Sequence, residues 1–410
     1  MIILVQAMFD NESQNPKIMS VLADEWKKMG HRVIKFYPCY SRDRVRELNK
    51  LDDVFAFYFP KKTKYKEFLT QLGSCGKTFI KLFLCCICHP FSATEFVFRR
   101  IPCFSNLFDE SILVRNKTKQ AINMFKADVV VAGSNPFFFP HGLALSKGQF
   151  IKIWYQMDPH ALNGMMSTKQ KKREFYKEKL IYDRMDKILV QPNSYSSITS
   201  TFNNEIASKI FATKFPLVNP EIVVKPDISY FDNSTINCVY AGALMLPIRR
   251  PEYMLKIFSL FKNKSIHLYI WCGNLTKNME DELKSLLPSN VSYLGSLPQS
   301  KMQAVLAGAD ILINLGNTIS NQLPSKILDY ISLRKPILNI YKVNDCPTID
   351  ILKDYPLSLS VSEDDDVEIV SEKIESFILE NIGNTVSSEL IKKAYQEYLP
   401  NSVAKYVLES

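Results

Sequence analysis

The sequence predicts an α/β protein built from two Rossmann-like, doubly wound domains. Short apolar runs alternate with segments of helical periodicity along most of the 410 residues. The runs are continuously apolar, which is typical of parallel strands covered on both faces. This rhythm breaks once, where Pro216, Pro220 and Pro226 follow one another. We therefore expect an N-terminal domain over 1–218 and a C-terminal domain over 219–410.

The N-terminal domain is expected to open with a strand, a helix and a second strand. The apolar run 2–7 predicts the first strand, and helical periodicity follows from Pro16 to Met29. Pro16 stands in the first turn, where a helix tolerates proline, and Gly30 stands where a helix ends in a left-handed turn. Further strands are expected at 32–38, 127–133, 150–157 and 187–192, with a helix near 168–185.

The C-terminal domain repeats this alternation. Strands are expected at 237–244, 265–273, 291–295, 310–316, 335–340 and 357–361, with helices at 251–262, 278–287, 299–308 and 324–334. Such alternation predicts a parallel sheet with right-handed crossovers. Two such domains are expected to face a cleft, with ligands at the carboxyl ends of the strands. The last helix is a candidate for crossing back to the first domain.

Composition favours an ordinary globular enzyme in the cytoplasm. Apolar residues make up 46% and charged residues 23%, and no run of about 18 uncharged apolar residues is present. The start lacks the basic segment of a signal peptide. Nine cysteines suggest reduced thiols. Cys85 and Cys88 precede His89, but there is no second cysteine pair, so we expect no metal site.

Familiar cofactor and nucleotide motifs are weak or missing. No GxG pair occurs, which disfavours a dinucleotide site and any bound cofactor. Residues 76–78 imitate the end of a P-loop, but Gln71 stands where its first glycine belongs. Residues 364–366 are three aspartates that could hold a divalent cation. They also open a helical segment, where the helix dipole favours acidic residues, and we prefer that interpretation.

Charge divides the chain. Residues 1–218 carry 33 basic and 19 acidic side chains, a net charge of +14, whereas residues 219–410 carry 18 and 23, a net charge of −5. A basic half suggests an anionic partner: nucleic acid, a phosphorylated ligand or an acidic membrane surface. The stretch 77–105 is apolar and aromatic, with basic residues at both edges. It fits either buried core or a surface for a lipid-linked acceptor or an anionic membrane.

The segment 310–338 is the most informative. A buried strand is expected to end at Gly316, and after a polar loop a helix opens near Pro324. The backbone donors of Ser325 and Lys326, the positive helix end and the lysine together favour a phosphate site. Asp329 shares the polar face with Ser325 and is placed for a hydroxyl such as that of a ribose. Taken alone, the pattern equally fits a capped amphipathic helix with a solvated aspartate.

Four segments in order resemble the nucleotide-sugar domain of GT-B-fold glycosyltransferases, in particular the large retaining family that builds bacterial surface polysaccharides. They are VYAGALMLPIRRPEYML, IHLYIWCGN, VSYLGSLPQSKMQAVLAGADILINL and LPSKILDYISLRKPIL. The resemblance covers about 237–340, and the N-terminal half matches only in its alternation of strands and helices. It implies two Rossmann-like domains and transfer of a sugar from a nucleoside diphosphate.

The resemblance also implies roles near the expected helix. The family has two glutamates separated by seven residues, and these positions fall on Asn321 and Asp329. Asp329 can still accept a hydrogen bond from a ribose, whereas Asn321 loses the charge of the proposed sugar contact. The loop backbone at Ser325 and the side chain of Lys326 would hold the diphosphate. Arg334 replaces the glycine usual in the family, at a position where a left-handed residue other than glycine costs roughly 1 kcal/mol.

Three further roles follow from the resemblance. Arg249 matches the second basic residue with which the family binds the diphosphate, and Arg250 is the alternative for this role. Leu297 lies where the family contacts the nucleotide base. In the first half, Asp158 after a buried strand is expected to contact the transferred sugar or the acceptor hydroxyl, with His160 behind it. The alternative is that Asp158 only makes a turn with the proline that follows.

The function that we expect is a cytoplasmic glycosyltransferase of hexosyltransferase type, retaining and metal-independent. It would use a UDP- or GDP-linked sugar and a glycan or lipid-linked acceptor in bacterial polysaccharide synthesis, peripherally on the inner membrane face and without a nucleic-acid partner. A nucleotide-sugar epimerase and a non-catalytic glycan- or partner-binding protein are the alternatives.

Overall fold

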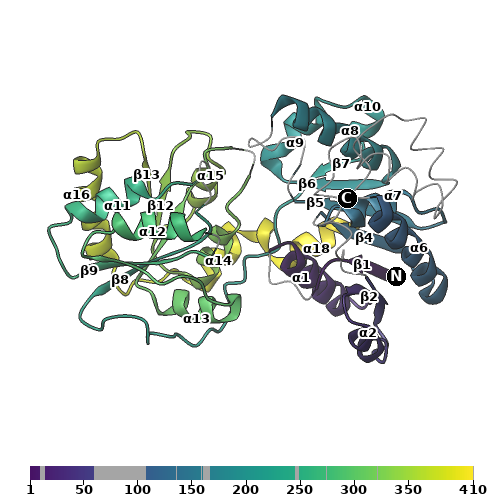
Figure 1. Cartoon of the computed structure of the whole chain (residues 1–410), viewed down its shortest axis with the longest axis horizontal. Coiled ribbons are helices and arrows are strands. Elements are labelled where there is room, and N and C mark those ends of the chain that lie inside the picture. The colour runs from purple at the N-terminus through teal and green to yellow at the C-terminus, as the bar shows by residue number, and fades with distance from the viewer. Residues whose placement is uncertain are drawn as a thin grey trace. The chain divides into compact units, whose positions relative to one another are not determined.

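The structure is a computed structural model, and it describes residues 1–9, 14–59, 108–134, 136–157, 159, 167–244, 249–273, 275–320 and 322–409. These residues form two compact units, residues 1–213 (unit 1) and 214–409 (unit 2). Each unit is an α/β layer structure around its own parallel sheet (Figure 1). The predicted doubly wound α/β class is confirmed. Within the described ranges, no helix combines the length and apolar character that a membrane crossing requires.

Unit 1 contains a seven-stranded sheet in the order β3-β2-β1-β4-β5-β6-β7, with every pair parallel. The strands are β1 Ile2–Gln6, β2 Arg32–Cys39, β3 Val54–Tyr58, β4 Val129–Gly133, β5 Ile151–Gln156, β6 Lys187–Val190 and β7 Ile210–Ala212. The helices are α1 Gln14–Lys28, α2 Arg42–Leu48, α6 Phe108–Phe125, α7 Phe138–Ala144, α8 Thr168–Arg184, α9 Pro192–Thr199 and α10 Asn204–Ala207.

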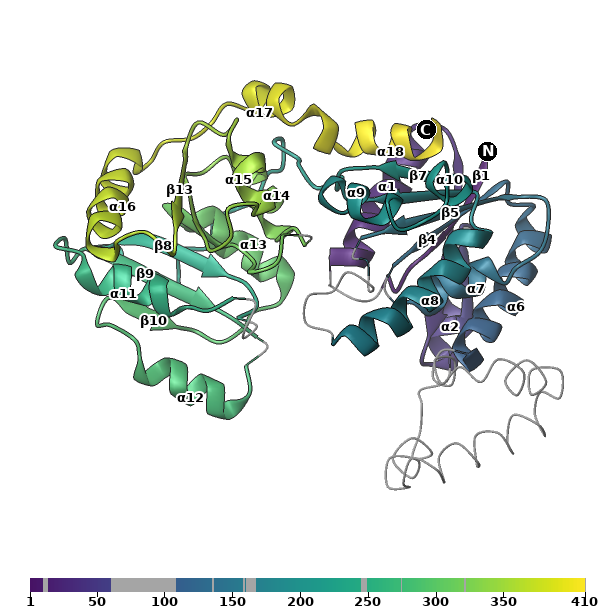
Figure 2. The same cartoon turned by 90° about the horizontal axis from the view of Figure 1, so that it is seen from above.

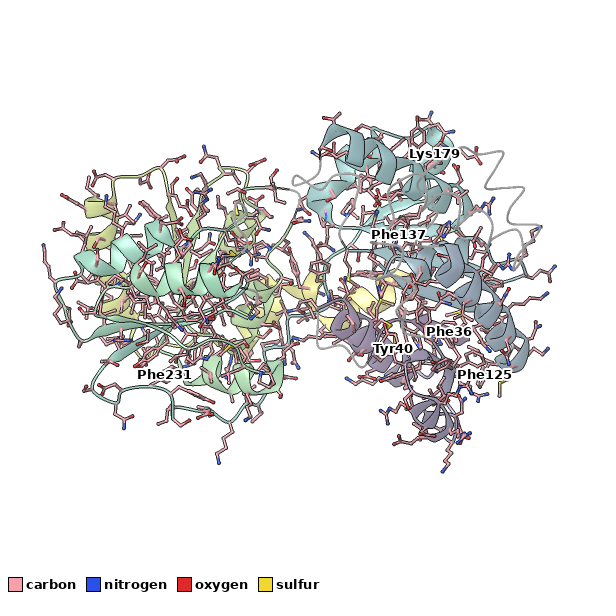
Figure 3. The ribbon with its side chains drawn as sticks, viewed as in Figure 1. Phe36, Tyr40, Phe125, Phe137, Lys179 and Phe231 are labelled. Carbon is pink, nitrogen blue, oxygen red and sulfur yellow. The ribbon has the colours of Figure 1, made fainter. Side chains whose placement is uncertain are left out.

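Aromatic side chains fill one face of the unit 1 sheet. Phe36 on β2 is fully buried and packs against Phe57 on β3 and Phe139 on α7, with ring centroids 4.7 and 6.4 Å away. Phe137, just before α7, meets the Trp154 ring edge to face at 6.1 Å. Figure 3 labels Phe36 and Phe137 among the crowded side chains of this unit. Burial of rings this large makes the apolar core the main stabilising term of the unit.

Unit 2 contains a six-stranded parallel sheet in the order β10-β9-β8-β11-β12-β13. The strands are β8 Ile236–Ala241, β9 Ile266–Trp271, β10 Val291–Tyr293, β11 Ile311–Leu315, β12 Ile337–Tyr341 and β13 Ser358–Ser362. The helices are α11 Glu252–Leu260, α12 Lys277–Ser285, α13 Gln299–Gly308, α14 Lys326–Leu333, α15 Pro347–Leu352, α16 Val367–Asn381, α17 Ser388–Ala394, the 3₁₀ helix η2 Gln396–Tyr398 and α18 Pro400–Glu409.

The unit 2 sheet is covered on both faces (Figure 2). Ile311 and Ile313 belong to the apolar cluster that includes α11 and α16, which pack against each other. Leu312 is also fully buried but lies on the opposite face, because successive strand residues alternate. Helices α13 and α14 pack together as well. The strands β9, β11 and β12 are buried along almost all of their length, which is why their sequences are largely apolar.

Two backbone details match the sequence expectations. Gly30 after α1 is left-handed, with φ of 84°. Arg334 after α14 is left-handed too, with φ of 61°, although it is not glycine. The third expectation needs a correction. The helix expected from Pro324 begins two residues later at Lys326, because Pro324 and Ser325 form the tight turn that precedes it.

Candidate functional site

Polar side chains gather at the carboxyl edge of the unit 2 sheet, where β8 and β11 end side by side. These two strands are parallel neighbours, with Ile311 opposite Cys238 and Ile313 opposite Tyr240. The loop after β8 carries Arg249, and the loop after β11 leads through Asn317 to α14. Because adjacent parallel strands deliver their loops to the same edge, residues far apart in the sequence meet here.

A hydrogen-bonded chain connects these two loops. The Arg249 Nε donates to the Asn317 Oδ1 at 2.7 Å, and the Asn317 Nδ2 donates to the Gln322 carbonyl oxygen at 2.8 Å. Asn317 is only 4% exposed, and Arg249 is half-buried, whereas its rival Arg250 is exposed. Arg249 is therefore the arginine that the fold ties to the segment before α14.

Two buried tyrosines lie beneath Arg249. The Tyr240 hydroxyl donates to the Ala243 carbonyl at 3.1 Å, and the Tyr330 hydroxyl on α14 donates to the Ala241 carbonyl at 3.4 Å. Burial raises the pKa of Tyr240 to about 12, although the nearby Arg249 guanidinium opposes this rise, and burial also raises the pKa of Tyr330. Both phenols are therefore neutral at physiological pH. They anchor the turn after β8 without placing a negative charge beside the guanidinium.

Gly242 makes this turn possible. A Cβ at this position would lie 2.8 Å from the Tyr240 hydroxyl oxygen, closer than real side-chain contacts allow. Glycine therefore lets the backbone pass directly over the phenol.

Helix α14 presents its N-terminus to the same edge. Ser325 is its N-cap residue and makes no side-chain cap hydrogen bond. The amides of Ile327 and Leu328 bond back to the carbonyls of Pro324 and Ser325, at 3.1 and 3.2 Å. Lys326 is half-buried in the first turn. Backbone donors and positive helix dipole at this end suit an anion such as phosphate.

The inner face of α14 fixes its position. Ile327, Leu328 and Ile331 are fully buried against the sheet, as expected from their spacing. Asp329 is half-buried in the first turn, on the other side of the helix. Ser325 and Asp329 are four residues apart and share one face. Any ligand phosphate at the helix end would therefore have a carboxylate one turn away.

The loops after β9 and β10 continue this edge. The Cys272 amide donates to the Gly295 carbonyl at 2.7 Å, and the Leu244 amide donates to the Cys272 sulfur at 3.3 Å. A Cβ on Gly273 would lie 2.8 Å from the Ser296 Cβ, so the two loops touch. Leu297 follows this contact and is half-buried. It therefore lies on the same edge as Arg249, beyond the loop after β9.

In unit 1 the end of β5 is held by buried polar contacts. The Ser134 hydroxyl donates to the Tyr155 carbonyl at 3.0 Å and accepts from the Met157 amide at 2.8 Å. The Gln156 amide donates to a Glu178 oxygen at 3.1 Å and accepts from the Tyr182 hydroxyl. Hydrogen bonds from Ser134 and from the Gln156 side chain thus hold residues 155–157 in place.

The structure places the predicted residues as follows. It brings Arg249 to the loop that precedes Ser325, Lys326 and Asp329, and it puts Leu297 on the same sheet edge. Three predicted residues, Asp158, His160 and Asn321, lie outside the described residues, as do residues 77–105 with their cysteines. Asn317 was not predicted. Its only sequence signal is its position directly after a buried strand and a glycine.

The three aspartates at 364–366 behave as the helix-cap interpretation expected. The Asp366 Oδ1 accepts from the amides of Glu368 and Ile369, at 3.0 and 3.1 Å, and so caps α16. Asp365 accepts from the Ser362 amide at 3.3 Å. Among the described residues, no group of three or more metal-ligating side chains is arranged to hold an ion.

The fold is shared with glycosyltransferases of known structure. A glycosyltransferase from Rickettsia africae is 13% identical with a TM-score of 0.57, covering 100% of this chain and 96% of its own. HepE from Anabaena, in complex with UDP and glucose, is 10% identical with a TM-score of 0.61, covering 100% and 98%. Sucrose-phosphate synthase from Thermosynechococcus elongatus is 10% identical with a TM-score of 0.61, covering 100% and 97%.

These likenesses confirm the predicted GT-B fold over the full chain. No protein-family model matches the sequence, and no curated protein matches it significantly. At such low identities the likeness establishes the fold alone. What the site does must be argued from its own residues.

Proposed function

We propose that the protein is a glycosyltransferase that moves a sugar from a nucleoside diphosphate to an acceptor. The observation that carries the proposal is the half-buried Arg249 bonded to the loop before the α14 N-terminus, at the edge where a doubly wound sheet binds ligands. A guanidinium and a helix end are two separate anion-binding groups, which suits a diphosphate. The shared GT-B fold supports this assignment.

The donor in this proposal is a UDP- or GDP-linked sugar. HepE, which has the same fold, binds UDP and UDP-glucose, and this supports a nucleotide-sugar donor. Arg249, Lys326 and the amides near Ser325 would hold the diphosphate. Asp329 would accept from the ribose, and Leu297 would support the base. Asn321 would contact the sugar.

The chemistry in this proposal rests on charge compensation at the leaving group. As the bond from the sugar to the diphosphate breaks, negative charge grows on the diphosphate. Groups that bind this charge more strongly in the transition state than in the ground state lower the barrier. Arg249, Lys326 and the helix end would do this without a metal ion or another cofactor. Asp158 would contact the transferred sugar or the acceptor hydroxyl, and the anomeric configuration would be retained.

The proposed acceptor is a glycan or a lipid-linked glycan in bacterial polysaccharide synthesis, and the proposal includes no nucleic-acid partner. The net charge of +14 on residues 1–218 supports binding to an anionic membrane face, which in this proposal is the inner, cytoplasmic face. Vesicle flotation tests the membrane claim. Association should require anionic lipid and should fall as salt is raised; absence of binding at low salt would remove this part of the proposal.

Incubation with a panel of nucleotide sugars tests the activity. Release of free nucleoside diphosphate that depends on an added acceptor supports transfer. Isomerised sugar nucleotide without acceptor would indicate an epimerase instead. Binding without any turnover would indicate a non-catalytic relative, an alternative motivated by Asn321 and Asp329, which replace the glutamates of the family pattern.

Lys326→Ala tests the binding site directly. Loss of a charge-assisted contact is worth about 1.5–3 kcal/mol, or roughly 10- to 150-fold in affinity. Isothermal titration calorimetry with UDP and GDP should show this loss, with Lys353→Ala as a control because Lys353 is an exposed lysine of the same unit. Equal affinities of the two variants would defeat the assignment.

A further inference from the structure

Arg249 is a half-buried cation in neutral surroundings. Its side-chain neighbours include the Asn317 amide, whose oxygen accepts from the Arg249 Nε at 2.7 Å, and the Tyr240 phenol, whose pKa is raised by burial. Within the described part of the chain, no carboxylate lies within ion-pair distance of Arg249. Charged groups that leave water are usually paired. Among the described residues, no ion pair therefore compensates the charge of this guanidinium.

Asn317 occupies the position where a compensating carboxylate would fit. An aspartate there would keep the acceptor oxygen beside Arg249 and would form an ion pair. It would lose the second contact, because only the amide nitrogen can donate to the Gln322 carbonyl at 2.8 Å. Asparagine therefore does two things at once: it orients the cation without neutralising it, and it ties the cation to the loop that leads to α14.

We infer that Asn317 is a positioning residue for the donor diphosphate. It sets the spacing between the guanidinium and the α14 N-terminus, so that two phosphoryl groups can be held together. This inference rests on the proposed function. It adds a specificity claim, because a nucleoside monophosphate has one phosphoryl group and can engage only one of the two anion-binding groups. Discrimination between diphosphate and monophosphate should therefore depend on Asn317.

The test compares Asn317→Asp with the wild-type chain. This substitution preserves side-chain size but pairs Arg249 with a carboxylate. We expect affinity for UDP, or for GDP if that binds the wild type better, to fall about 10-fold or more. Affinity for the matching monophosphate should change by less than about 3-fold, as measured by titration calorimetry. Asn317→Ser, which removes the tie to the loop without adding charge, should lose less of the diphosphate affinity than Asn317→Asp.

Two controls separate positioning from folding. Asn384→Asp makes the same chemical change at an exposed asparagine whose amide donates to the Glu380 carbonyl at 3.3 Å, and it should bind both nucleotides as the wild type does. Thermal unfolding of each variant without ligand reports structural damage. Equal losses for diphosphate and monophosphate in Asn317→Asp, in step with a lowered melting temperature, would mean a structural role and would overturn the inference.

The outcomes also distinguish this inference from the proposed function. Failure of the wild type to bind any nucleoside diphosphate would remove the proposed function, and the inference with it. Tight diphosphate binding that is lost in Arg249→Met but is unchanged in Asn317→Asp would leave the function standing and refute the role of Asn317 alone.

Discussion

Replacing Arg249 by methionine is the most direct test of the unit 2 site. Methionine keeps an unbranched apolar stem of similar reach and removes only the guanidinium. The neighbouring Arg250 provides a matched control, because the same substitution one residue along the chain changes an exposed side chain. The two variants have identical composition and net charge. Any difference between them must therefore come from where each arginine lies.

The magnitude follows from the contacts. A guanidinium has five N–H donors, and one of them, on Nε, is used by Asn317 at 2.7 Å. A charge-assisted contact from the others to a diphosphate is worth about 1.5–3 kcal/mol, so Arg249→Met should weaken binding roughly 10- to 150-fold. An exposed ion pair is worth about 0–1 kcal/mol, so Arg250→Met should weaken nucleoside diphosphate binding by about 5-fold at most.

Titration calorimetry with UDP and GDP measures these affinities, and acceptor-dependent release of nucleoside diphosphate gives kcat/KM. If the arginine acts on the leaving group in the transition state, Arg249→Met should lower kcat as well as raise KM. Stability is a separate readout. Loss of the bond to Asn317 should lower the free energy of unfolding by only about 0.5–1.5 kcal/mol. Equal affinities in the two methionine variants would refute the assignment of Arg249.

Three further predictions concern stability and use urea unfolding as the measurement. Gly316→Ala should lower the free energy of unfolding by about 1–3 kcal/mol, because the added Cβ would lie 2.9 Å from the Cys346 sulfur. Adding Cys346→Ala should restore part of this free energy, and no restoration would argue against the clash. Asn339→Ala should lower the free energy of unfolding by about 3 kcal/mol, because the Asn314 amide and the Thr348 hydroxyl both lose the oxygen to which they donate. A decrease below about 1 kcal/mol would contradict this prediction. Burial lowers the pKa of His267, so the unfolded chain binds a proton more readily than the folded chain does. The free energy of unfolding should therefore fall as the pH drops below 6.5. His267→Asn should flatten this dependence of the free energy of unfolding on pH, and an unchanged slope would count against the prediction.

Much of the fold was accessible from the sequence because its strands are buried on both faces. A strand such as β11, fully buried along its length, carries apolar side chains at every position except Asn314 and so stands out. The strands β3 and β7 were not predicted. Both are edge strands, and β7 has only three residues, a run too short for periodicity to separate it from a loop.

The site was only partly accessible from the sequence. The helix N-terminus and Lys326 could be predicted locally, because phosphate-binding character is set within one turn of a helix. Asn317 could not, because its partner Arg249 is 68 residues away in the sequence. A single asparagine after a strand is an ordinary turn residue. Only the pairing of β8 with β11 brings Asn317 within hydrogen-bonding distance of Arg249.

Net charge also shows why the neutral contacts of Arg249 matter. Residues 219–410 carry a net charge of −5, so the overall field of this half repels an anionic ligand. Attraction must then come from short-range groups that solvent and salt screen weakly. A guanidinium held by an amide and a phenol keeps its full charge at such a place, whereas a carboxylate partner would cancel it. Nucleotide affinity should therefore depend on the geometry around Arg249 far more than on surface charge.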